Sequence, residues 1–90
     1  MLNRYEYRVC QIQLNRVTFV NGQWQGTQDY DVDEYDRVSK SCPEVWDYLS
    51  AAGAEGWELV ATSNNTVIQD NQYSQVVSNI FLKRVKAESS

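Results

Sequence analysis

The stretch that most constrains the fold is Gly53-Ala-Glu-Gly56-Trp57-Glu58-Leu59-Val60, where a helix is expected to end and a strand to begin. Val45, Leu49 and Ala52 precede it at i, i+4 and i+7 spacing, which predicts a short helix with one apolar stripe. Gly53 is placed to end this helix in the left-handed conformation. The sequence therefore predicts a helix followed directly by a strand in the middle of the chain.

A tight β-hairpin is predicted at Asn21-Gly22, because a type I′ turn needs positive φ at both of its central residues. We expect one long strand over residues 4–20 to lead into this turn. The returning strand is expected to run to about Val38. In this register Phe19 faces Trp24 across the hairpin as an aromatic pair.

The remaining elements complete an α+β domain. Ser41-Cys42-Pro43-Glu44 matches a capping box, which predicts the start of the helix. Strands are predicted from Trp57 to about Ile68 and from Val76 to Val85. The expected fold is an antiparallel sheet of about four strands with one helix on one face, in the order β-β-α-β-β with a long first hairpin. Residues 1–86 form a single domain in this prediction, and residues 87–90 a frayed tail.

Three motifs carry a family resemblance: Tyr5-Glu6-Tyr7-Arg8-Val9, then Leu49 with Gly53–Val60, then Phe81-Leu82-Lys83-Arg84. With them the chain resembles a family of short bacterial proteins catalogued as a domain of unknown function. The resemblance covers most of the chain, and its Gly-Trp-Glu-Leu block is the most specific part. Two departures are Arg8 in place of the usual lysine and an inserted hairpin over roughly residues 14–38. The resemblance implies a fold and no activity, and it transfers no catalytic residue.

The charge of the chain argues against nucleic acid as a partner. The formal net charge is −4 and the pI about 4.6, whereas nucleic-acid-binding proteins carry clustered Lys and Arg. Met1–Arg8 is polar, and no stretch has the length and apolarity to cross a bilayer, so we expect a cytoplasmic protein without membrane contact. Cys10 and Cys42 form no CxxC pair and are expected as two thiols in a reducing compartment, although a disulfide is not excluded.

Catalytic and metal-binding patterns fail at specific positions. Asp29, Asp31 and Asp33 begin like a calcium loop, but Glu34 and Lys40 stand where that loop needs Gly and Glu. A nucleophile lacks a base, since the chain contains no histidine. Glu55 and Glu58 could act as an acid–base pair only if both lay in a cleft. We therefore predict a non-enzymatic protein with no cofactor and no metal site.

Apolar residues are expected on both faces of the sheet. On the last strand Ile80 and Leu82 alternate with Val77, Phe81 and Val85. A helix about 10 Å wide cannot cover a four-stranded sheet roughly 15–19 Å across. The open face predicts a homo-oligomer, with a dimer as the first guess, unless the long hairpin folds over it.

Trp57 is expected in the core, with its indole N–H bonded to a nearby carbonyl. Strand alternation places it on one face with Leu59 and Ala61, opposite Val60.

The function predicted from these features is a self-associating interaction domain, acting through the open sheet face or the long hairpin, with an unidentified protein as a further partner. The candidate interaction residues are Phe19, Trp24, Tyr30 and Phe81. The alternative is a small-molecule-binding protein with an aromatic-lined pocket between protomers. Its polar groups would come from Arg16, Gln23, Gln25 and Arg37.

Overall fold

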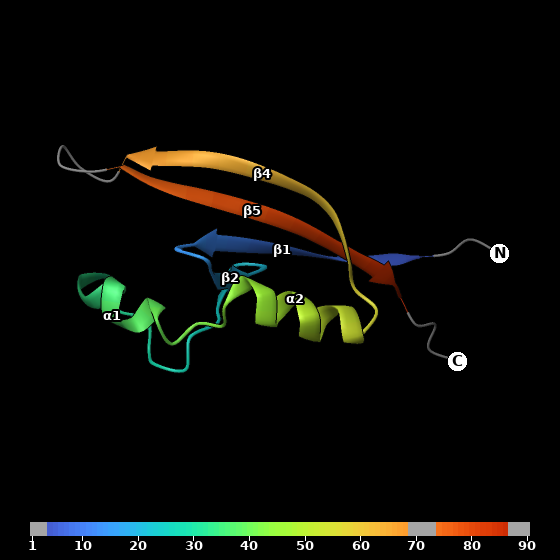
Figure 1. Cartoon of the computed structure of the whole chain (residues 1–90), viewed down its shortest axis with the longest axis horizontal. Coiled ribbons are helices and arrows are strands. Elements are labelled where there is room, and N and C mark those ends of the chain that lie inside the picture. The colour runs from blue at the N-terminus through green and yellow to red at the C-terminus, as the bar shows by residue number, and fades with distance from the viewer. Residues whose placement is uncertain (1–3, 69–73, 87–90) are drawn as a thin grey trace.

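A computed structural model describes residues 4–68 and 74–86 (Figure 1). The elements are β1 (Tyr5–Gln13), β2 (Arg16–Val20), β3 (Gln23–Trp24), the 3-10 turn η1 (Val32–Glu34), α1 (Tyr35–Ser39), α2 (Val45–Ala54), β4 (Glu58–Ile68) and β5 (Ser74–Val85). The strands form one antiparallel sheet of five in the order β3-β2-β1-β5-β4. The α+β class is confirmed, but the prediction of four strands and one helix is wrong. The predicted tail at 87–90 lies outside the described residues.

The expected single strand over residues 4–20 is two strands. Leu14 and Asn15 have φ values of 52° and 64° and form a two-residue turn between β1 and β2. Asn tolerates this left-handed region, while an apolar residue such as Leu14 rarely adopts it. Leu14 also continued the apolar alternation of β1, and for that reason the turn was missed.

The hairpin at Asn21-Gly22 is confirmed in position and register. The φ values are 50° and 82°, and Phe19 pairs with Trp24. Asn21 also extends the neighbouring ladder, because its backbone N–H donates to Val9 O and its Oδ1 accepts from Val9 N, both at 2.9 Å. The turn is therefore bonded to β1 as well as closing the β2–β3 hairpin.

The returning strand does not reach Val38. β3 ends at Trp24, and the acidic segment that follows forms η1 and α1 instead of a strand. Asp31 begins η1 by accepting a 3.0 Å hydrogen bond from Asp33 N at its side chain. The Asp31 side chain therefore begins a local turn, a use of Asp that competes with strand pairing.

The capping box is also wrong. The N-cap of α2 is Glu44, without a side-chain hydrogen bond, and the Val45 N–H donates instead to Asn15 O at 3.0 Å. Ser41 turns the other way, since its Oγ donates to Val38 O at 2.6 Å and accepts from Gln28 N at 3.2 Å. Tertiary contacts thus supply the partners that the local motif was expected to provide.

The helix ends one turn later than predicted, and Gly56 rather than Gly53 takes the left-handed conformation, with φ at 93°. Gly56 N donates to Gly53 O and Trp57 N to Ala52 O, both at 3.0 Å, which is the Schellman arrangement. From the sequence alone, either Gly53 or Gly56 could supply the left-handed residue that ends the helix. The motif turns the chain so that Trp57 faces back toward α2.

The core lies between α2 and one face of the sheet (Figure 1). The predicted stripe of Val45, Leu49 and Ala52 is confirmed, because all three pack in or against the buried cluster. The buried members of the cluster are Cys10, Val17, Ala52, Trp57, Ile80 and Leu82. In Figure 1 α1 lies beyond the arrowhead of β1, and the end of β4 and the start of β5 also extend past that arrowhead.

A β-bulge changes the facing of β4. Leu59 pairs with Leu82 and Ala61 with Phe81, so the register shifts at Val60. The expectation that Leu59 and Ala61 share a face is wrong, because one extra residue in a strand reverses the alternation that follows. Ala61 therefore lies on the face of the sheet that is turned away from α2.

Candidate functional site

The face of the sheet turned away from α2 is here called the second face. Cys10 and Ile12 of β1 pack in or against the α2 core. Because successive side chains of a strand point to opposite faces, Tyr5, Tyr7 and Val9 point to the second face. By the same alternation, Gln11 and Gln13 of β1 also point to the second face.

The half of the second face at the start of β1 is bare. Tyr5 is 41%, Tyr7 62%, Val9 42% and Val85 58% exposed. Tyr5 pairs with Val85 and Val9 with Phe81, so these side chains lie side by side on two strands. We call Tyr5, Tyr7, Val9 and Val85, together with the half-buried Phe81, the bare patch. Grouped exposed apolar side chains of this kind mark interaction surfaces on soluble proteins.

Two opposite charges belong to this surface, Lys83 within the bare patch and Glu58 beside it on β4. Lys83 pairs with Tyr7 in the sheet, and its Nζ lies 4.8 Å from the centroid of the Tyr5 ring. The same Nζ lies 3.6 Å from Glu58 Oε1 on β4. An exposed pair of this kind contributes about 0–1 kcal/mol, so its main consequence is that the surface is locally neutral.

The other half of the second face is covered by an aromatic cluster that consists of Phe19, Trp24, Tyr30 and Tyr35. Ring centroids lie 5.4 Å apart for Phe19 and Trp24, and 5.1 Å for Trp24 and Tyr30. Tyr30 also contacts Phe19 at 5.8 Å and Tyr35 at 6.1 Å, in edge-to-face geometry. Each such pair adds about 0.5–1.5 kcal/mol beyond area burial. The cluster therefore anchors residues 25–35 onto the sheet.

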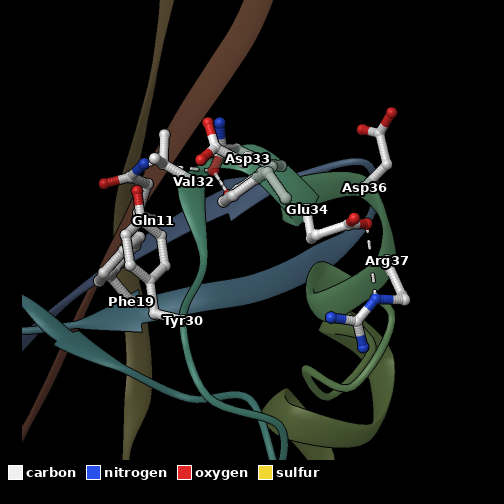
Figure 2. Close-up of a pocket in the computed structure, with 10 residues that line it drawn as sticks. Gln11, Phe19, Tyr30, Val32, Asp33, Glu34, Asp36 and Arg37 are labelled. Atoms are coloured by element: carbon white, nitrogen blue, oxygen red, sulfur yellow. Dashed lines mark hydrogen bonds and ion pairs between the residues drawn. The ribbon is translucent and has the colours of Figure 1, made fainter.

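Beside the cluster is a cavity of about 410 Å³, here called the aromatic pocket. Its lining residues are Gln11, Gln13, Phe19, Tyr30, Val32, Asp33, Glu34, Tyr35, Asp36 and Arg37. In Figure 2 Phe19 and Tyr30 form one side of the pocket, and Glu34 and Arg37 the opposite side. Two lining residues are bonded to each other: the Tyr35 hydroxyl donates to Gln13 Oε1, and Gln13 is only 6% exposed.

The aromatic pocket carries excess negative charge. Among the described residues, Arg37 is the one cation that lines the pocket. Its Nε lies 3.6 Å from Glu34 Oε2, and its Nη1 donates to Gln28 Oε1 at 2.8 Å. Within residues 4–68 and 74–86, neither Asp33 nor Asp36 forms an ion pair. The lining therefore has two carboxylates that are not neutralised by this part of the chain.

The candidate interaction residues fall into two groups. Phe19, Trp24 and Tyr30 come together in the aromatic cluster, whereas Phe81 lies beside Val9 in the bare patch. Tyr35 joins the cluster and was not predicted, because the expected strand ran through it. Of the polar groups named for a ligand site, Arg37 lines the pocket, while Arg16 bonds Cys42 O at 2.7 Å, and Gln25 bonds Gln23 O at 3.0 Å.

Trp57 is buried, as predicted, but its indole N–H is not bonded as expected. It is 8% exposed, and its Nε1 has no hydrogen-bond acceptor among the residues that the structure describes. Two guanidinium groups lie against the ring instead, Arg8 at 4.3 Å and Arg84 at 4.5 Å from the centroid. Arg84 is held by an ion pair with Glu6, and Arg8 donates to the Tyr48 hydroxyl at 2.9 Å. This arrangement closes the end of the α2 core.

Both cysteines are buried and free. Burial raises the pKa of the Cys10 thiol above its ordinary value of 9.0, against smaller opposing effects of Tyr48 and Arg8. Burial likewise raises the pKa of the Cys42 thiol. Both groups are neutral thiols near neutral pH.

These shifts predict an alkaline loss of stability. Well below pH 9.0, the ordinary pKa of the thiols, both states bind the thiol protons, so these two groups add no pH dependence to the free energy of unfolding. Above it the unfolded state binds fewer protons than the folded state, so the free energy of unfolding falls as pH rises. Urea unfolding at about pH 7 and about pH 10 measures the decrease. The double variant Cys10→Ala/Cys42→Ala should show a smaller decrease, and an equal decrease in both proteins would contradict the assignment.

No helix among the described residues has the length and apolarity needed to cross a membrane. Comparison with family models, curated proteins and solved structures found no match for this chain. The family resemblance of the three motifs therefore stays a prediction.

Proposed function

We propose that this chain is a non-enzymatic interaction domain that forms a homodimer through the bare patch. The observation that carries the proposal is the unequal coverage of the sheet. One face packs on α2, half of the second face is covered by residues 25–35, and the bare patch remains exposed. Burying such a patch against protein is favourable by roughly 25 cal/mol for each Å² of apolar surface removed from water.

A second copy fits the bare patch because the patch is electrostatically self-complementary. Lys83 lies within the patch, between Phe81 and Val85 on β5, and its Nζ is 3.6 Å from Glu58 Oε1 on β4. A two-fold axis near this pair would bring Lys83 of each copy toward Glu58 of the other. Two copies of a chain with net charge −4 could then approach through a neutral surface.

The size of the bare patch sets the strength of association. It spans about five residues along each of two strands, β1 and β5, or roughly 16 by 10 Å. A standard interface buries about 800 Å² on each partner, so this patch is smaller than a standard interface. We expect a concentration-dependent dimer of micromolar or weaker affinity, not a permanent one.

The non-enzymatic part of the proposal has its own support. The chain contains no histidine. Of the two glutamates considered for acid–base chemistry, Glu58 pairs with Lys83 on the surface, and Glu55 is exposed. We also propose a reducing, cytoplasmic setting, which the two free buried thiols support.

Sedimentation equilibrium over a wide concentration range tests the dimer. Tyr7→Glu places a charge in the centre of the patch and is expected to weaken association about tenfold or more. Trp46→Glu is the matched control, because Trp46 is a 77% exposed aromatic on α2, away from the patch. A wild-type chain that stays monomeric at millimolar concentration, or a Tyr7→Glu variant that dimerises normally, would refute the proposal.

A further inference from the structure

We propose that the aromatic pocket binds a small organic cation, with a quaternary or primary ammonium as the recognised group. The pocket lies at the covered end of the second face, and its residues belong to a single chain. This inference is independent of the proposed dimer, because no residue of the bare patch lines the pocket.

The cavity has the dimensions of a small-molecule site. Its volume of about 410 Å³ lies within the roughly 300–1,000 Å³ typical of ligand pockets. The aromatic cluster and the hydrogen bond between Tyr35 and Gln13 hold these lining residues in place without a ligand. A ligand therefore need not order the site, which lowers the cost of binding.

Aromatic rings supply the first part of the recognition. Phe19, Tyr30 and Tyr35 all line the cavity, and Tyr30 is 49% exposed. Ring faces attract an alkylammonium through their quadrupole when it lies within about 6 Å of the centroid. Figure 2 shows the Phe19 and Tyr30 rings together on one side of the pocket. A methylated cation suits this side, because its methyl groups also gain apolar contact.

Carboxylates supply the second part and decide the sign of the ligand charge. Glu34 is engaged by Arg37, whereas Asp33 and Asp36 have no ion-pair partner among the described residues. In Figure 2 the Asp36 carboxylate lies at the outer rim and points away from the rings, so it acts on a bound ligand at long range. The resulting field favours a cation and opposes a carboxylate or phosphate.

The indole N–H of Trp24 provides a reporter next to the pocket. It donates to Gln28 O at 2.8 Å, and the Trp24 ring lies 5.1 Å from the Tyr30 ring. In ¹H–¹⁵N spectra its resonance can be assigned by its loss in Trp24→Phe. A ligand against Tyr30 will shift this resonance, because it changes the ring currents and packing around Trp24.

The experiment titrates the protein with choline and, separately, with 3,3-dimethylbutan-1-ol, which has the same shape without the charge. We expect a saturable shift of the Trp24 resonance, with choline bound about fivefold or more tightly than the alcohol. Tyr30→Leu should weaken choline binding about two- to fivefold, and Asp33→Asn should reduce the preference for choline over the alcohol. Trp46→Leu is the control and should bind choline as wild type does, because Trp46 is 77% exposed on α2 and lies outside both the aromatic pocket and the bare patch.

Each result has a definite meaning for the proposal. Equal affinity for choline and the alcohol would show that the pocket selects shape and not charge, and would overturn it. The absence of any saturable shift with choline would overturn it as well. A dimer that fails to form while choline still binds would refute only the proposed function, and the reverse pattern would refute only this inference.

Discussion

Replacing Trp57 with alanine is expected to lower the free energy of unfolding by about 3–5 kcal/mol, as removal of a large buried aromatic side chain does. Trp57 is 8% exposed and belongs to the α2 core cluster. The change also removes the ring on which Arg8 and Arg84 stack. A domain of this size has roughly 5–13 kcal/mol of stability, so the variant should be close to unfolding. Urea denaturation followed by circular dichroism measures the change.

Two variants make this result specific. Trp46→Ala removes the same side chain from a site that is 77% exposed, and we expect it to change stability by less than about 0.5 kcal/mol. Trp57→Phe keeps an aromatic ring for Arg8 and Arg84 and removes the buried indole N–H, which has no acceptor among the described residues. It should therefore cost clearly less than Trp57→Ala. Equal losses for Trp46→Ala and Trp57→Ala would mean that Trp57 does not belong to the core.

Replacing Gly26 with alanine is expected to destabilise the fold by about 1–3 kcal/mol through overpacking. A Cβ atom at this position would lie 2.5 Å from Ser41 Oγ and 2.6 Å from Trp24 Nε1. Trp24 would have to move, and its 2.8 Å hydrogen bond to Gln28 O would be lost. Urea unfolding measures the loss, and the indole resonance of Trp24 reports the displacement.

Gly53→Ala is the matched control for this substitution. Gly53 lies inside α2, and a Cβ there would meet no atom within 4 Å. Since glycine in a helix interior costs about 0.5–1 kcal/mol relative to alanine, this variant should be more stable than wild type. If Gly26→Ala were as stable as Gly53→Ala, the close approach of residue 26 to Trp24 would be wrong.

Part of the interaction surface could be predicted from the sequence. The alternation of β5 placed apolar residues on both faces, and the structure leaves Val85 exposed while Leu82 is buried. Phe19 and Trp24 were paired correctly because the Asn21-Gly22 turn sets their register. The aromatic pocket could not be predicted, since it depends on residues 25–37 folding back onto β1. No periodic pattern encodes that return.

Local backbone chemistry accounts for what the sequence determined by itself. Asn21-Gly22 adopts positive φ at low cost, and the apolar stripe of α2 follows from helical spacing. These signals act between neighbours, so they can be recognised without the fold. They were sufficient to predict the hairpin at Asn21-Gly22, the helix α2, the long strands β4 and β5, and apolar residues on the second face.

Tertiary structure decided everything that depends on contacts between distant residues. The Leu14-Asn15 turn is held in place by a hydrogen bond that Val45 N donates to Asn15 O. The bulge at Val60 exists only because β4 pairs with β5. Trp57 is enclosed by arginines from two different strands. Such arrangements exist only once the sheet has formed, because each residue's conformation there is set by partners far along the chain and not by its neighbours.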